Sequence, residues 1–186
     1  MQSITPPPNV RRLEPAEWPI YRELRLRALA DSPDAFGSTL VVEQGRSAED
    51  WASRLTRDAT SGLDHPLIAE VAHAAAGLAW ARVDASDRSI VNVYQMWVAP
   101  EFRGQGAGRL LLRAAVDWAR SLDATSVQLG VTCGDTPAIR LYTREGFTPF
   151  GPLGSLRPGS LVLGQSMRLQ LKEGWICTAP SGLPNA

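Results

Sequence analysis

The segment RGQGAG, residues 103–108, carries three glycines at alternate positions. Glycines cost extra chain entropy on folding, so this density indicates that something approaches the backbone closely. The segment lies between the apolar stretches VYQMWVAP and RLLLRAAVDWA, an order that predicts a strand, a tight turn and a helix N-terminus. The first N–H groups of a helix lack intrahelical partners and attract anions. With the cationic Arg103 beside them, they predict a phosphate or diphosphate site; the alternative is that the glycines serve only close packing.

Two common nucleotide-binding motifs fit this segment poorly. A P-loop needs GxxxxGK[ST], and the lysine and the hydroxyl residue are missing. A dinucleotide-binding motif needs G-x-G-x-x-G and an acidic residue about 20 positions later. Here the glycines run G-x-G-x-G after an arginine, and the next strand ends in VTCGD after a longer interval. A dinucleotide-dependent enzyme is therefore a weaker alternative.

Two motifs in the chain resemble those of the GNAT superfamily of N-acetyltransferases. The stretch VAPEFRGQGAGRLLL is similar to the family's acetyl-coenzyme-A signature R/Q-x-x-G-x-G/A, with Arg103, Gly106 and Gly108 in register. The stretch VQLGVTCGDTPAIRLYTREGF resembles the family's strand followed by N-x-x-A-x-x-x-Y-x-x-x-G-F. Its matching residues are Ala138, Tyr142, Gly146 and Phe147, while Asp135 replaces the usual asparagine. The two motifs cover residues 89–150 in the family's order.

The resemblance implies an α/β fold with a mixed central sheet, flanked by helices, and acetyl-CoA as the cosubstrate without a metal. The sheet would splay between the strand before RGQGAG and the strand Val127–Val131, and coenzyme A would lie in the opening. Backbone groups of Trp97 and Val98 would pair with the pantetheine arm, and the Val98 amide would polarise the thioester carbonyl. The residues implied in cofactor binding are Trp97, Val98, Arg103, Gly104, Gln105, Gly106, Ala107, Gly108, Asp135, Ala138 and Tyr142.

The same resemblance assigns a general acid but no clear base. Tyr142 matches the tyrosine that protonates the leaving thiolate, and a pKa near ~10 keeps such a hydroxyl protonated at neutral pH. The bulged strand of the family often supplies a glutamate, but here it offers Gln95, which cannot accept a proton. Glu43 is the first candidate base. Water relayed by backbone carbonyls is an equal alternative, and Glu70, His73 and Asp84 are weaker ones.

These features predict an acetyl-CoA-dependent N-acetyltransferase that acts by direct attack of a primary amine in a ternary complex. Balanced charge favours a small-molecule amine as acceptor, and Trp51, Trp80 and Trp97 are candidates for an apolar acceptor pocket. The alternatives are a non-catalytic acyl-CoA sensor and a protein N-acetyltransferase. Family members often dimerise, so the C-terminal extension is a candidate homodimer interface.

Several elements must position these residues. Expected helices cover residues 14–29, residues from Ser47 through Leu55, residues 107–122 and the stretch TPAIRLYTRE; expected strands cover residues 10–13, 67–71, 77–83, 89–98, 127–131, 147–150 and 161–171. In the strand before the glycines, apolar residues alternate through Val93 and then resume on the opposite parity from Tyr94. A β-bulge causes such a slip; the alternative is a strand buried on both faces.

Composition sets the broad class. The 186 residues suit a single domain over residues 9–172, with a flexible lead-in at 1–8 and an extension at 173–186. Lys+Arg and Asp+Glu both number 19, which gives no reason to expect a nucleic-acid partner. Two cysteines and two histidines argue against a disulfide framework or zinc site and favour a cytoplasmic location. No apolar stretch approaches the ~20 residues that span a bilayer.

Overall fold

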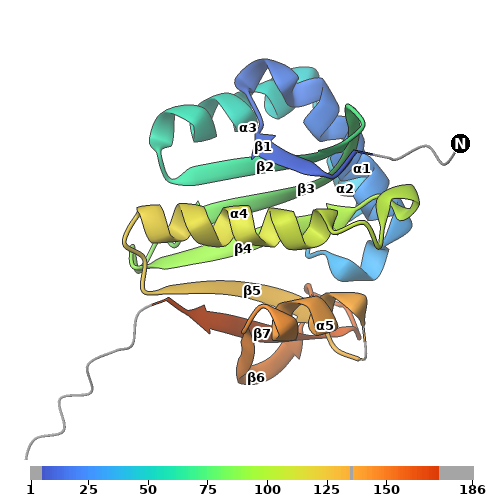
Figure 1. The fold of residues 1–186 in the computed structure, drawn as a ribbon. Coiled ribbons are helices and arrows are strands. Elements are labelled where there is room, and N and C mark those ends of the chain that lie inside the picture. Colours follow the sequence, from blue (N-terminus) through green and yellow to red (C-terminus); the bar gives the residue numbers. More distant parts are fainter. Residues whose placement is uncertain (1–5, 135, 172–186) are drawn as a thin grey trace, which may run out of the picture.

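The computed structural model describes residues 6–134 and 136–171, which form one sheet with helices on both faces (Figure 1). The strands are β1 (Asn9–Arg12), β2 (Asp64–Val71), β3 (Ala74–Val83), β4 (Ile90–Val98), β5 (Ser126–Thr132), β6 (Thr148–Ser155) and β7 (Leu163–Gln170). The helices are α1 (Trp18–Asp31), α2 (Leu40–Gln44), α3 (Ala48–Ser61), α4 (Ala107–Ser121) and α5 (Pro137–Arg144). Short 3-10 turns cover Pro15–Glu17, Pro33–Ala35 and Pro100–Phe102.

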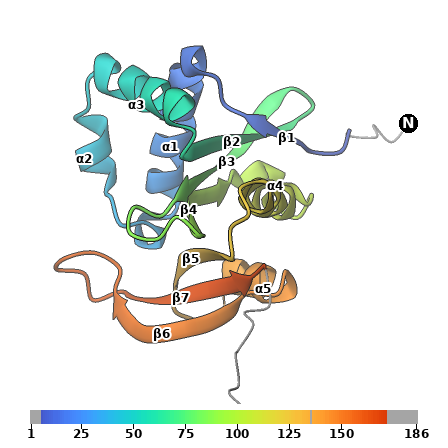
Figure 2. The same cartoon turned by 90° about the vertical axis from the view of Figure 1, so that its left-hand side faces the viewer.

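The sheet is mixed, as the sequence predicts. The seven strands formed by the described residues lie in the order β1-β2-β3-β4-β5-β7-β6, and among them only β4 and β5 run parallel. Turned by 90°, the molecule shows α1, α2 and α3 on one face of the sheet and α4 on the other (Figure 2). Each face has its own apolar core, one beneath α1 and α3 and one beneath α4 and α5.

The central parallel pair opens partway along its length. The pairing runs from Ile90 opposite Ser126 to Val93 opposite Leu129 and then ends, although β4 continues to Val98 and β5 to Thr132. Beyond Val93 the facing edges of these two strands therefore no longer bond to each other. This confirms the predicted splay between the strand before the glycines and the strand that contains residues 127–131.

A β-bulge in β4 lies at the start of this opening. Leu78 of β3 pairs with Trp97 of β4, but Trp80 pairs with Tyr94, so β4 has one extra residue between the two pairs. Gln95 adopts a positive φ of 55° there, a left-handed backbone conformation that is unusual for a residue other than glycine. The parity slip at Tyr94 is thus a bulge, as predicted.

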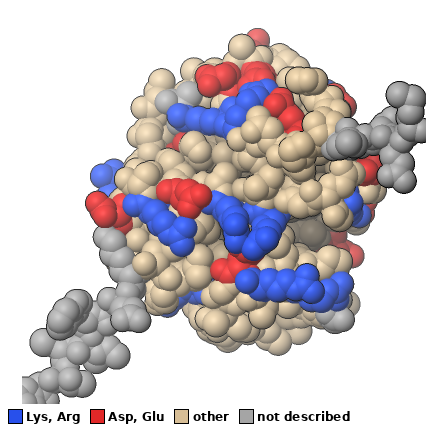
Figure 3. Space-filling view, viewed as in Figure 1, with Lys and Arg blue, Asp and Glu red and all other residues tan. Residues whose placement is uncertain are grey.

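Helix α4 packs on the sheet largely as its periodicity predicts. Leu111 and Ala115 are fully buried, and Trp118 stacks on His65 with ring centroids 5.0 Å apart. Leu122 follows Leu111, Ala115 and Trp118 in the same helical period, but it is 41% exposed because the helix ends at Ser121. The arginines on the outer face of α4 lie beside acidic side chains (Figure 3): Arg109 and Arg113 pair with Glu145, and Arg120 pairs with Asp117.

Other sequence expectations need correction. The expected helix over residues 14–29 begins as a 3-10 turn and becomes α-helical only at Trp18. Helix α2 was not predicted. The last strand begins at Leu163 and not at the expected Leu161, which is 98% exposed. Within the described residues, no helix has the length and apolar character to span a membrane.

Candidate active site

The glycine loop leaves the start of α4 open. Gly104 and Gly106 have φ values of 77° and 91°, a region that side chains disfavour, and a Cβ at either would meet no protein atom within 4 Å. Gly106 is also the N-cap of α4, which has no side-chain cap. Within the described chain, space beside these amides is therefore available for an anion. An open helix N-terminus of this kind is compatible with the diphosphate of the predicted cosubstrate.

The third glycine has a different environment. A Cβ on Gly108 would lie 3.5 Å from Cδ2 of Leu141 and 3.6 Å from Cγ2 of Val98, which is ordinary van der Waals contact. A methyl group would therefore fit where the first turn of α4 packs against α5 and the end of β4. Close packing does not require glycine at this position, whereas the backbone conformation explains Gly104 and Gly106.

The sequence suggests that the Arg103 side chain lies beside the loop amides, but in the structure this side chain faces other groups. Its Nε donates to the carbonyl oxygen of Val98 at 3.0 Å, and its Nη2 donates to Asp31. Asp31 also accepts a hydrogen bond of 2.8 Å from Nε1 of Trp97. The guanidinium therefore joins the end of α1 to the end of β4, and an anion at the loop would rely chiefly on backbone amides.

A cavity of about 800 Å³ lies where β4 and β5 diverge. The bulge residues Gln95 and Met96 line it on one side, Gly130 to Thr132 on another, and Ala138 and Tyr142 of α5 close an end. Phe36 and Trp80 provide apolar walls. Because Met96 also lies near Gly108 (3.9 Å from an added Cβ), the cavity adjoins the glycine loop.

Tyr142 is held in α5 at the wall of this cavity. Helix α5 begins at Pro137, where Oγ1 of the N-cap Thr136 accepts a hydrogen bond of 3.2 Å from the Ile139 amide. It stops before Gly146, whose φ of 90° suits glycine. The Tyr142 side chain is only 6% exposed, and this burial raises its pKa to about 12. Its hydroxyl is therefore protonated at neutral pH, as a general acid must be.

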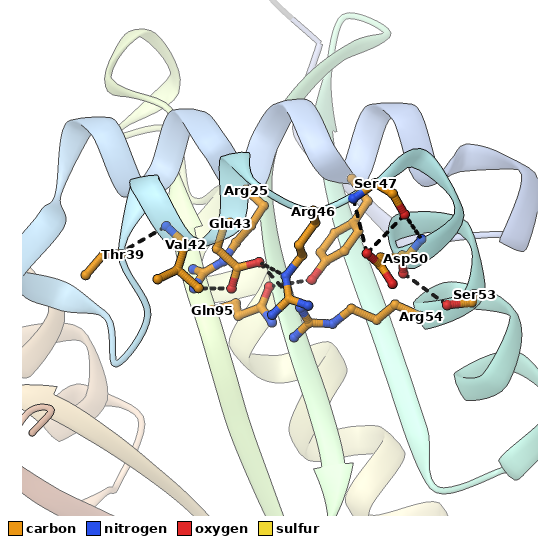
Figure 4. Close-up of polar contacts among 11 residues, drawn as sticks. Arg25, Thr39, Val42, Glu43, Arg46, Ser47, Asp50, Ser53, Arg54 and Gln95 are labelled. Carbon is orange, nitrogen blue, oxygen red and sulfur yellow. Dashed lines mark hydrogen bonds and ion pairs between the residues drawn. The ribbon is translucent and has the colours of Figure 1, made fainter.

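Three arginines surround Glu43 at the opposite side of the cavity (Figure 4). Arg46 donates from Nε to Oε2 of Glu43 at 2.7 Å, while Nη2 of Arg25 and Nη1 of Arg54 lie 3.9 and 3.8 Å from its carboxylate oxygens. Arg25, Glu43 and Arg54 come from α1, α2 and α3, and all three line the cavity. We call Arg25, Glu43, Arg46 and Arg54 the arginine cluster.

This environment does not suit Glu43 as a base. Burial alone would raise the pKa of Glu43. Two effects outweigh burial and lower this pKa below its usual range: hydrogen bonds from Arg46 and Ser38, and the charges of Arg46 and Arg25. A carboxylate with a lowered pKa accepts a proton less readily. Glu43 is instead placed to neutralise and orient the neighbouring guanidinium groups.

The other candidate bases lie elsewhere. Glu70 pairs with Arg11 at 2.8 Å, and His73 lies in the turn between β2 and β3. Asp84 accepts hydrogen bonds from Ser86, Asp87 and Asn92, which lower its pKa to about 2. None of these three residues lines the cavity, and among the described residues that do, Glu43 is the only carboxylate.

Of the three tryptophans considered for the acceptor pocket, only Trp80 lines the cavity. Trp51 is fully buried in the core beneath α1 and α3, and the indole of Trp97 is directed to Asp31. Asp135 lies outside the described residues. Sequence reasoning missed Arg25 and Arg54 entirely, since single arginines on amphipathic helices carry no signal that distinguishes burial from exposure.

Comparison with known proteins gives a consistent result. A model of the acetyltransferase (GNAT) family matches residues 16–147. A mycothiol acetyltransferase from Thermobispora bispora is 34% identical over 145 residues, which is 75% of this chain and 46% of that protein. The chain thus spans less than half of that relative's length.

Solved structures share the fold. The protein yncA from Salmonella typhimurium, solved with its cofactor acetyl-CoA, superposes with a TM-score of 0.74 and 20% identity over 97% of this chain and 99% of its own. Spermidine N-acetyltransferase from Vibrio cholerae, in complex with CoA and spermine, superposes with a TM-score of 0.69 and 19% sequence identity. The match covers 88% of this chain and 95% of that protein. With the matched family model, the splayed sheet and the glycine loop, these findings show that the chain belongs to the acetyltransferase (GNAT) family.

Proposed function

We propose that the chain transfers the acetyl group of acetyl-CoA to a primary amine of a small molecule, by direct attack in a ternary complex. The observation that carries this proposal is the continuity between the open glycine loop and the 800 Å³ cavity, which has room for both an acyl arm and an acceptor. Relatives named for the acetylation of mycothiol and spermidine support a small acceptor.

In this proposal the backbone amides of residues 103–108 hold the diphosphate, with Gly104, Gln105, Gly106, Ala107 and Gly108 contributing main-chain groups. Acetyl-CoA supplies the activated acetyl group. The open edge of β4 at Trp97 and Val98 pairs with the pantetheine arm, since that edge has no partner on β5. The Val98 amide is the proposed donor to the thioester carbonyl.

Tyr142 is the proposed general acid. Its hydroxyl keeps its proton at neutral pH and donates it to the departing sulfur while the amine forms the new bond to the acetyl carbon. An alkylamine with a pKa of ~10.4 must first lose a proton, which costs about 4.6 kcal/mol at pH 7. Because Glu43 is a poor acceptor, we propose that water along the carbonyls of the splayed strands removes this proton.

The test is a panel of primary amines incubated with acetyl-CoA and purified protein, read as released thiol and as acetylated product by mass spectrometry. The proposal predicts stoichiometric thiol and N-acetyl product with at least one small amine, and an initial-rate pattern in which both substrates bind before release. Tight coenzyme A binding without turnover of any amine would instead indicate a sensor.

A further inference from the structure

Arg25 is a buried cation with donors that no other described residue satisfies. Its side chain is only 4% exposed, yet within residues 6–134 and 136–171 its Nε and Nη1 have no hydrogen-bond partner. Its Nη2 lies 3.9 Å from Glu43, too far for a hydrogen bond. Leaving charged donors unpaired in a buried position is costly, so such groups usually have a ligand or a functional reason.

Packing accounts for one surface of this guanidinium but not for its donors. Cζ of Arg25 lies 4.7 Å from the centre of the Phe36 ring, so the guanidinium makes a cation–π contact with this ring. The N–H donors project from the edge of the guanidinium plane. Arg25 lines the cavity, which is the space that an acceptor would occupy.

The cluster also has an excess of positive charge. Glu43 is its only anion, set against Arg25, Arg46 and Arg54, so the four side chains sum to a net charge of +2. Arg46 hydrogen-bonds Glu43 at 2.7 Å, which leaves Arg25 and Arg54 as the cations with only long contacts to it. Arg54 lies over the rings of Tyr21 and Trp80, which hold its guanidinium at the cavity wall.

We propose that the acceptor is an amine that also carries a carboxylate, and that Arg25 and Arg54 bind this carboxylate. This inference rests on the proposed function and deepens it by naming the substrate class. A carboxylate supplies acceptor oxygens for the unpaired donors and reduces the net charge of the cluster to +1. Phe36, Trp80 and Met96 provide apolar surface in the same cavity, which favours amino acids with apolar side chains.

The experiment compares matched triplets of acceptors with acetyl-CoA: L-phenylalanine, its carboxamide and phenethylamine, and the corresponding set from L-methionine. The expected result is that each acid has a kcat/KM about 10- to 100-fold higher than its amide or amine, the range for a hydrogen bond to a charged group. The comparison of acid with amide is decisive, because the amine of the amide is less basic than that of the acid and protonation therefore favours the amide.

Variants connect the preference to the cluster. Arg54→Gln and Arg25→Gln are expected to remove the preference for the acid, so that within each variant the kcat/KM values of the acid and its amide agree within about threefold. Arg57→Gln on α3 and Arg22→Gln on α1 are matched controls, because both are exposed and neither lines the cavity. Circular dichroism checks folding; if Arg25→Gln does not fold, Arg54→Gln alone decides.

Each other outcome overturns the inference in a distinguishable way. Equal or better turnover of the amides and amines would refute the carboxylate site and leave the proposed function intact. A preference for phosphorylated amines such as phosphoethanolamine would refute the carboxylate assignment in favour of phosphate. No turnover of any amine, despite coenzyme A binding measured by calorimetry, would refute the proposed function itself.

Discussion

The hydroxyl of Tyr21 donates a hydrogen bond of 2.9 Å to Oε1 of Gln95. Tyr21 is fully buried in α1, and Gln95 is the bulge residue that lines the cavity. Because Oε1 is occupied by Tyr21, the Nε2 end of the amide presents only donors. The bond therefore fixes both the bulge and the polarity of the side chain where the acyl group is expected.

Tyr21→Phe is expected to lower the free energy of unfolding by about 1 kcal/mol, the net contribution of one hydrogen bond. It should also lower kcat, since the amide of Gln95 loses its fixed orientation. Urea unfolding of Tyr21→Phe, Gln95→Ala and the double variant measures their coupling. Strictly additive losses would show that the bond contributes nothing.

Tyr142→Phe is expected to reduce kcat by about 10²- to 10⁴-fold, the usual contribution of general acid–base catalysis. Its affinity for coenzyme A should stay within about twofold, because only the hydroxyl is removed. Since burial raises the pKa of Tyr142 to about 12, the wild-type rate should show no loss from this group up to pH 10. Steady-state kinetics and calorimetry provide the measurements; an unchanged kcat would exclude Tyr142 as the acid.

Gly106→Ala is expected to weaken coenzyme A binding more than tenfold. The new methyl group occupies space beside the loop amides, and the φ of 91° adds backbone strain of about 1 kcal/mol. Gly62→Ala is the matched control, because Gly62 has a φ of 67°, ends α3 and also has open space around it. Both variants should lose similar stability in thermal unfolding, but only Gly106→Ala should lose affinity. Equal affinities would place the diphosphate elsewhere.

Glu43→Gln is expected to leave the pH dependence of acetylation unchanged. The hydrogen bonds and charges of its arginine neighbours lower the pKa of Glu43 and make it a weaker proton acceptor, so we expect the rate to rise with pH toward the pKa of the amine itself in both proteins. Stability should fall by roughly 1–3 kcal/mol, because Arg25 and Arg54 lose their shared counterion. If the folded variant lost more than about 10²-fold in rate and its pH–rate profile lacked an inflection that the wild type shows, Glu43 would be the base after all.

His65 is expected to make stability depend on pH. Burial, followed by the charge of Arg12, lowers its pKa to about 4, so the unfolded state binds the proton more tightly. The contribution is present above the unfolded pKa of ~6.5 and is lost as the pH falls toward 4. It is at most ~3 kcal/mol, and roughly 1–2 kcal/mol once solvent screening of the partly exposed ring is allowed for.

The comparison variant is His65→Phe, which keeps an aromatic ring against Trp118. Unfolding free energies at pH 7 and pH 4 are measured for both proteins, so that losses from carboxylates cancel. The wild type should lose the additional 1–2 kcal/mol. Identical losses would mean that His65 titrates normally in the folded protein.

Local patterns predicted the central strand, its bulge and helix α4 because the causes are local, while the family resemblance supplied the splayed sheet. The strand, glycines and helix of residues 89–122 follow one another directly, and the parity slip at Tyr94 located the bulge. Helix α2 left no such signal: it has five residues, and its Val41 and Val42 are 79% and 59% exposed. A short helix with exposed apolar residues does not show the amphipathic period.

The acceptor side could not be predicted in this way. The pattern of α1 does not single out Arg25, yet this residue is buried among groups from α2 and α3. Arg103 likewise pairs with Asp31, a residue 72 positions away in the chain. Such contacts depend on how three helices pack against the sheet, and one sequence gives no direct measure of that.

A crystal structure with coenzyme A bound is the most direct test of the cosubstrate site. We expect diphosphate oxygens within hydrogen-bond distance of main-chain nitrogens in residues 103–108, and the sulfur between the bulge at Gln95 and the hydroxyl of Tyr142. A diphosphate bound away from the start of α4, or a sulfur outside the opening between β4 and β5, would contradict the proposed site.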